Sequence, residues 1–306
     1  MSNVAMVTAA VLYLVAMTAH AVEWASVRTV ASTKALVSPG ATGPAPTTSG
    51  EQVPSRSAVR SDLAGRIGIA WTVLAVACQA LGVVLRGVAA DRFPWGNMYE
   101  FVTTSLLFIG IAHLYLASRR GMRWLGLPVT LLLTIGQGLA VTVFYVAVAP
   151  LVPALHSVWF VIHIVAAAIS AAAFNLGAIA SVLYLIRTSR WAERRPARFA
   201  LVPSAASLDT FAYRAHAFAF PLWTFTVAAG AIWADYAWGR FWGWDPKETW
   251  SLVTWVVYAA YLHARATAGW KGRGAAWLAI VGVATFWFNF VGINLLVTGL
   301  HSYAGI

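Results

Sequence analysis

The chain has 306 residues, of which 60% are hydrophobic and 10% charged, and its mean hydropathy is +0.72. This composition excludes a soluble domain and is typical of a polytopic membrane protein. The net charge of +11 does not indicate a nucleic-acid partner, because the cationic residues are spread between apolar segments. The single Cys78 excludes an internal disulfide and a Cys-x-x-Cys redox motif.

Apolar segments long enough to span a bilayer, which takes about 17–25 residues, recur along the chain. They predict an all-α polytopic membrane bundle of about eight transmembrane helices. The predicted spans lie near 3–22, 65–89, 100–118, 124–148, 158–186, 215–234, 250–268 and 275–299.

Three parts are expected along the chain. Residues 1–22 form a first transmembrane helix, retained rather than cleaved because no basic region precedes it. Residues 23–62 form a flexible cytoplasmic linker, since most of this segment is rich in Ser, Thr, Ala, Pro and Gly. Residues 65–306 form the main membrane domain.

The Lys and Arg residues predict the orientation, because cationic residues are concentrated on the cytoplasmic side of a membrane. With both termini outside, 17 of the 21 lie inside, and the other four are Arg86, Arg92, Arg240 and Lys247. The chain is thus expected in the plasma membrane, with the loops at 90–99 and 235–249 on the outer side.

The second of these loops contains the most unusual stretch, Trp238-Gly-Arg-Phe-Trp-Gly-Trp-Asp-Pro-Lys-Glu248. Its charged residues are too costly for a membrane span, and an interfacial aromatic belt needs fewer Trp residues. The cluster suggests an aromatic shelf for a large planar ligand.

This stretch resembles the signature of the tryptophan-rich (WWD) heme-handling family, of the CcsA/ResC type in the system II cytochrome c synthase. The resemblance spans about residues 65–306. It rests also on the segments Trp95–Glu100, Pro153–His163, Tyr261–His263 and Gly299–Tyr303.

The resemblance implies that His163 and His301 ligate heme at an external site, and both are expected near the outer surface. It implies that His263, well inside the seventh predicted span, ligates heme at a second, intramembrane site. The opposite ligand there is expected from a ResB-like partner. His113 lies at a similar depth and is the alternative ligand within this chain, and His263 could instead be an interhelical polar residue.

In the Trp-rich loop, Trp238, Trp242 and Trp244 are expected to stack on the porphyrin, while Gly239 and Gly243 allow close approach. Asp245 is expected to orient the loop or cap the following helix. Arg240 and Lys247 are candidates for the heme propionates. Residues Asn97, Tyr99 and Glu100 are expected to pack beside this shelf.

The implied function is c-type cytochrome biogenesis. The chain would present heme b at the outer face and, with the ResB-like subunit, attach it to the Cys-x-x-Cys-His motif of apocytochrome c. Thiol-reducing thioredoxin-like proteins are further expected partners. The alternative is a heme transporter or chaperone without ligation activity. A non-heme channel is disfavoured because the predicted spans carry almost no Asp or Glu.

Overall fold

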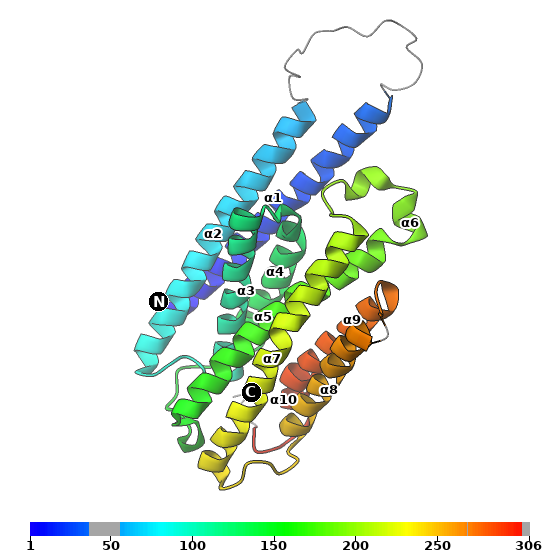
Figure 1. The fold of residues 1–306 in the computed structure, drawn as a ribbon. Helices are drawn as coiled ribbons and strands as arrows, with labels where there is room; N and C mark the ends of the chain where they lie inside the picture. The colour runs from blue at the N-terminus through cyan, green and yellow to red at the C-terminus, as the bar shows by residue number, and fades with distance from the viewer. Residues whose placement is uncertain (37–55, 268, 302–306) are drawn as a thin grey trace, which may run out of the picture.

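The computed structural model describes residues 1–36, 56–267 and 269–301. Over these residues the chain is helical with no β-strand, which confirms the all-α prediction (Figure 1). The helices are α1 (Ser2–Leu36), α2 (Arg56–Ala90), α3 (Met98–Arg120), α4 (Gly126–Thr142), α5 (Val158–Arg187), α6 (Arg190–Glu193), α7 (Ala205–Trp238), α8 (Pro246–Thr267), α9 (Arg273–Trp287) and α10 (Ile293–Leu296). Short 3-10 turns lie at Arg123–Leu125, Pro153–Leu155 and Pro196–Phe199, and a π-helical turn, Phe288–Gly292, joins α9 to α10.

Seven helical segments within the described residues are long and apolar enough to cross a membrane. They correspond to α1 through α5, α7, and the continuous stretch from α9 to α10. The chain is therefore a multi-pass membrane protein, as its composition predicts.

The predicted span at 250–268 is helical, as α8, but is not among these seven. The reason lies in its composition, since α8 contains Lys247, Glu248, His263 and Arg265. It packs against α7 and α9, so most of its stability within a bilayer comes from neighbouring helices.

The expected linker at 23–62 is shorter than its composition suggests. Helix α1 continues to Leu36 and α2 begins at Arg56, so both ends of this segment are helical. Ala, Leu, Lys and Arg at these ends favour helix. Residues 37–55 lie outside the described part of the chain.

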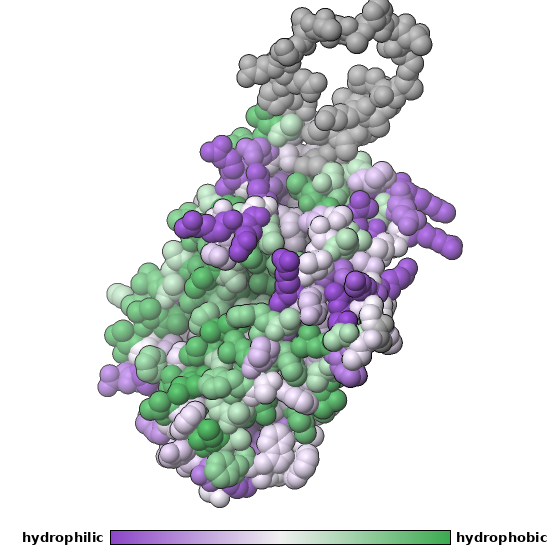
Figure 2. All heavy atoms as spheres, in the orientation of Figure 1, coloured by the Kyte–Doolittle hydropathy of each residue, from purple (hydrophilic) through white to green (hydrophobic). Residues whose placement is uncertain are grey.

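The surface fits a bilayer environment. Apolar side chains such as Val7, Val84 and Ile135 point outward and are exposed. Figure 2 shows broad apolar surface along the bundle, with hydrophilic residues gathered at the end where α6 lies.

Two of the groups of buried side chains in the described residues are the largest. The larger of the two lies mainly among the first five helices, reaches α6 and the start of α7, and includes Tyr13, Leu106 and Leu133. The smaller is aromatic and joins α5, α7, α8 and α9, with Phe174 stacked on Tyr258 at 3.9 Å between ring centroids. This second group forms the floor beneath the site described next.

The composition of α8 leads to a prediction about membrane insertion. Placed alone in a host protein with reporter glycosylation sites, segment 246–267 should insert poorly, because its charged residues lack their partners there. Segment 273–296, which is as long and more apolar, is the matched control and should insert well. Equal insertion of the two segments would contradict this account of α8.

Candidate functional site

A large cavity opens at the end of the bundle where the α2–α3 and α7–α8 loops lie, opposite α6 (Figure 1). Its volume is about 1140 Å³, counting the open space at its mouth. Its walls are largely apolar and come from α3, α5, α7, α8, α9, the π-helical turn and the α2–α3 and α7–α8 loops. Their aromatic residues are Trp95, Phe101, Phe160, Trp223, Trp233, Phe241, Trp242, Phe286 and Phe290.

His163 lines this cavity from the first turns of α5, a helix that Ser157 caps. Its Nδ1 lies 2.8 Å from the carbonyl oxygen of Thr226 on α7. Because a carbonyl only accepts hydrogen bonds, Nδ1 carries the proton and Nε2 carries a free lone pair. The ring packs closely on α7, where a Cβ at Gly230 would lie 2.7 Å from Nδ1.

His301 lines the same cavity from the chain segment that follows α10. Its Nδ1 lies 2.7 Å from Oδ2 of Asp245. A carboxylate partner at Nδ1 orients an imidazole and raises the basicity of Nε2, as it does for metal-binding histidines. The two predicted external ligands are thus brought to one cavity, each held through Nδ1.

Asp245 organises this part of the site. Its Oδ1 accepts a hydrogen bond from Leu300 N at 2.8 Å, and Oδ2 accepts one from Lys247 N at 3.2 Å. Burial alone would raise the pKa of this carboxyl. The hydrogen bond and charge interaction with His301, helped by the two backbone N–H groups, outweigh burial and lower the pKa to about 2. Asp245 therefore remains ionised beside His301 at physiological pH.

Trp233 contacts both histidines. Its ring centroid lies 5.9 Å from that of His163 and 5.4 Å from that of His301, and its Nε1 donates to Ala154 O at 2.7 Å. Sequence reasoning did not select Trp233 because it lies inside an apolar span, where a Trp is usual near the interface. Its position five residues before Trp238 was the only signal.

The three predicted shelf tryptophans have different positions. Trp242 lines the cavity. Trp238 is not part of the wall but packs edge-on against His301, at 4.8 Å between centroids. Trp244 is 68% exposed and has a left-handed backbone, with φ of +59°, so it points away from the cavity.

Other predicted residues of this loop support it rather than line the cavity. Gly239 ends α7 in a left-handed conformation, with φ of +69°. A side chain at Gly243 would collide with the Arg240 guanidinium, so Arg240 would have to move from its place. Arg240 is paired with Glu248, with Nη1 3.1 Å from Oε1. Lys247, by contrast, lines the cavity.

His263 lies outside this cavity. Its side chain is exposed on α8, and it forms no side-chain hydrogen bond within the described residues. His113 is fully buried on α3 next to His20, with 6.3 Å between ring centroids. The structure therefore does not bring His113 and His263 into one site.

Comparison with known proteins identifies the chain. A family model described as cytochrome C assembly protein matches residues 95–301. The chain belongs to the cytochrome c assembly protein family. Three relatives are each called cytochrome c biogenesis protein CcsA. That of Guillardia theta is 36% identical over 261 residues, covering 78% of this chain and 85% of the relative. That of Gloeobacter violaceus is 35% identical, covering 71% and 80%, and that of a Picosynechococcus species is 34% identical, covering 78% and 87%.

The segment shared by the cytochrome c assembly family coincides with the cavity. It begins at Trp95, in the first loop that lines the cavity, and ends at His301. Helices α1 and α2 lie before it.

The ionisation of Asp245 leads to a prediction about stability. Because its pKa is lowered in the folded protein, its contribution is present above the usual value of 3.8 and is lost as the pH falls through about 2. Between about pH 5 and 8, Asp245→Asn should destabilise the protein by about 2 kcal/mol, typical for a hydrogen bond to a charged group. Thermal unfolding in detergent should show this gap closing in strong acid. A gap that stays constant toward pH 2, or that is absent at neutral pH, would contradict the role of Asp245.

Proposed function

We propose that this chain acts in c-type cytochrome biogenesis by binding heme b, its cargo, between His163 and His301. Acting with a ResB-like partner, it presents that heme to apocytochrome c for covalent attachment. The observation that carries the proposal is the pair of histidines in one aromatic-walled cavity, each held through Nδ1 with Nε2 available. Imidazole nitrogen is a common axial ligand of heme iron, and flat aromatic walls suit a porphyrin.

The attachment needs little chemistry from the protein. Each thioether forms when a cysteine S–H adds across a vinyl C=C of heme, so that no group leaves and no external oxidant is consumed. The cysteines of the Cys-x-x-Cys-His motif must be reduced thiols, which is the role proposed for thioredoxin-like partners. This chain contributes positioning, axial ligation and a largely apolar cavity that excludes water.

Lys247 is the better candidate for a heme propionate. Its ammonium lies 5.5 Å from the centre of the Phe290 ring in the cavity wall, and it forms no ion pair within the described residues. Arg240 is already paired with Glu248. We therefore assign the propionate contact to Lys247 and a structural role to Arg240.

The cavity is proposed to face the outer side of the plasma membrane. Of the four cationic residues predicted to lie on the outer side, Arg86 and Arg92 form ion pairs with the buried Glu100, and Arg240 pairs with Glu248. These three positive charges are thus paired with two buried carboxylates, while the other 17 Lys and Arg residues are predicted to lie on the inner side. This asymmetry supports an orientation with both termini outside.

His263 is proposed as one ligand of a second heme site completed by the ResB-like partner. Its exposure on α8 supports this idea, because a ligand shared between subunits must reach the surface of its own chain. Heme would then move from that site to the outer cavity. The alternative is a carrier that binds heme in the same cavity but leaves ligation to another protein.

The two histidines can be tested together. Protein purified in detergent, with and without the ResB-like partner, should show the sharp reduced α and β absorption bands of bis-histidine heme. His163→Ala and His301→Ala should each abolish these bands and the production of heme-stained cytochrome c. His156→Ala is the matched control, because His156 is exposed and its side chain, within the described part of the chain, bonds to Leu151 O alone, at 3.3 Å.

Normal bands and normal cytochrome in both alanine variants would refute the assignment. Bands that disappear while cytochrome is still made would show that the bound heme is not the one attached. A wild-type protein that binds heme but makes no cytochrome, even with the partner, would favour the carrier alternative.

The orientation has its own test. In a Cys78→Ala background, Val148→Cys lies in the exposed loop at the cavity end, and Arg194→Cys lies in the exposed loop at the opposite end. A membrane-impermeant maleimide applied to intact cells should label the first and not the second. Labelling of Arg194→Cys alone would reverse the proposed orientation.

A further inference from the structure

Two segments that lie far apart in the sequence share one pattern. Residues 92–100 read Arg-Phe-Pro-Trp-Gly-Asn-Met-Tyr-Glu, and residues 240–248 read Arg-Phe-Trp-Gly-Trp-Asp-Pro-Lys-Glu. Both are nine residues long. Each begins with Arg-Phe, contains Trp-Gly, has Asn or Asp three residues before its end, and finishes with Glu. We call them the first and second rim segments.

The two final glutamates make corresponding contacts. Glu100 Oε2 accepts from Gly96 N at 2.8 Å, and Glu248 Oε2 accepts from Gly243 N at the same distance. In each segment this glycine follows the tryptophan. Each glutamate lies in the first turn of its helix, α3 or α8, three residues after the Asn or Asp. Both segments are thus variants of the capping box.

The arginines also correspond. Arg92 Nη1 lies 2.7 Å from Glu100, and Arg240 Nη1 lies 3.1 Å from Glu248, each from eight residues earlier. A Cβ on Gly96 would lie 2.8 Å from Leu151 Cδ1 and 2.9 Å from the Arg92 guanidinium carbon, and one on Gly243 would lie 2.0 Å from the guanidinium carbon of Arg240. Each arginine therefore passes over its own glycine to reach its glutamate, and the arginine can take that path only where there is no side chain.

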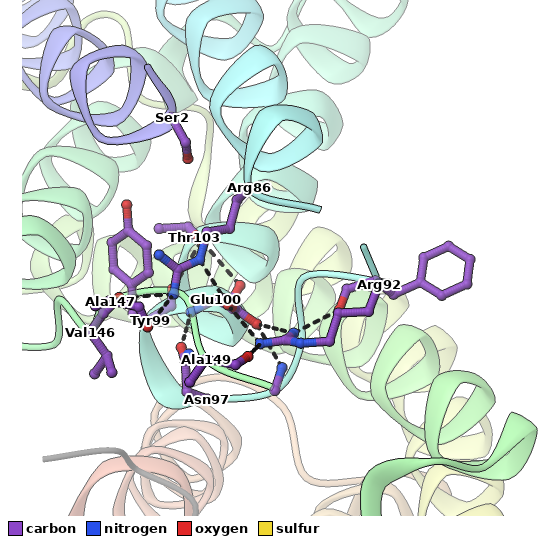
Figure 3. Close-up of polar contacts among 12 residues, drawn as sticks. Ser2, Arg86, Arg92, Asn97, Tyr99, Glu100, Thr103, Val146, Ala147 and Ala149 are labelled. Atoms are coloured by element: carbon purple, nitrogen blue, oxygen red, sulfur yellow. Dashed lines mark hydrogen bonds and ion pairs between the residues drawn. The ribbon is translucent and has the colours of Figure 1, made fainter. Parts of the chain in front are cut away.

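The first rim segment is anchored more firmly than the second. Figure 3 shows Glu100 between Arg86 and Arg92, with Arg86 Nε 2.8 Å from Oε1. The two guanidinium groups also donate to carbonyl oxygens of the loop after α4, Arg86 to Val146 and Ala147 and Arg92 to Ala149. Glu100 is 1% exposed. This network fixes the loop before α3 to two other elements.

Both segments line the same cavity. The first contributes Trp95 through Met98, and the second contributes Phe241, Trp242, Lys247 and Glu248. They differ in one function, since the second has Asp245, which holds His301, where the first has Asn97, whose side chain accepts from Glu100 N at 2.9 Å. The first segment therefore supplies a wall without supplying a ligand anchor.

We propose that the two rim segments are equivalent halves of one heme-binding rim, and that Glu100 is a positioning residue that acts on heme through Trp95–Met98 as Glu248 acts through Trp242. This inference rests on the proposed function, because it names the contacts of the same heme site. The role assigned to the first rim segment is to hold part of the heme-binding wall. Its charged residues alone do not indicate that role, and the segment is far in sequence from His163 and His301.

Matched glycine variants give the sharpest test, because a Cβ at either glycine crowds the arginine of its segment (and at Gly96 also Leu151) while both charged partners are kept. Gly96→Ala and Gly243→Ala should each lower heme occupancy several-fold and shift the reduction potential in the same direction. Gly138→Ala is the control, since no atom lies within 4 Å of a Cβ built there. Size-exclusion profiles and thermal unfolding check that the bundle remains folded.

A second pair covers the case in which a glycine variant does not fold. Arg92→Gln and Arg240→Gln keep a hydrogen-bonding side chain and remove one charge from each rim segment, while Arg86 still pairs with Glu100. Their occupancy and potential should change together, as for the glycines. If the first-segment variants retain wild-type heme occupancy and potential while the second-segment variants lose them, the equivalence is wrong and Glu100 serves folding alone.

Hydrogen exchange separates this inference from the proposed function. In protein prepared without heme, Gly96→Ala should speed amide exchange at residues 93–97, and Gly243→Ala at residues 241–245, with no change in Gly138→Ala. If wild-type protein never binds heme but exchange responds in this way, the heme assignment is wrong, and the Arg-Glu contacts that hold the two rim segments are still supported. If exchange does not respond in either segment, the proposal that these Arg-Glu contacts hold the rim segments in place is refuted.

Discussion

The site depends on one constraint: a charge removed from water must find its partner within the protein. The cavity end of this bundle contains three carboxylates that are more than nine-tenths buried, Glu100, Asp245 and Glu248. Each is satisfied by backbone N–H groups of a loop together with one or two cationic or imidazole groups. The carboxylates therefore determine where the loops lie, and the loops in turn place the aromatic walls. His301 is positioned in the same way, because it is the partner that Asp245 recruits from the end of the chain.

The sequence predicted the fold class and that His163 and His301 lie close to one another, and the reasons are physical. Long apolar segments can only be helices in a bilayer, so the bundle followed directly. Eight spans were expected where seven helical segments are sufficiently apolar, because α8 is amphipathic and depends on its neighbours. His163 and His301 were placed together by resemblance and by topology, and both line the cavity. Trp233 could not be selected in this way, because only packing distinguishes it from an ordinary interfacial tryptophan.

Side chains within a single motif can have opposite orientations. The Trp-rich loop suggested three equivalent stacking surfaces, yet Trp242 lines the cavity, Trp238 supports His301 and Trp244 is exposed. The left-handed backbone at Trp244 turns the chain between the cavity wall and the cap of α8. Similarly, Arg240 is used internally and Lys247 is left available. Neighbouring residues in a tight turn point in different directions, so the spacing of a motif identifies a site but does not assign its members.

The position of Trp233 bears on how tightly the proposed heme cargo would be held. Its ring packs against both imidazoles, so a porphyrin bound between them, as we propose, would have to exchange that aromatic contact for its own. The net affinity is then the difference between two favourable interactions rather than the full strength of the new one. A protein that keeps its heme permanently would benefit from the largest possible difference between these two interaction free energies, because its affinity would then be highest. A protein that must surrender its ligand once per cycle gains from a small one, because the competing contact re-forms as the ligand leaves and makes departure faster.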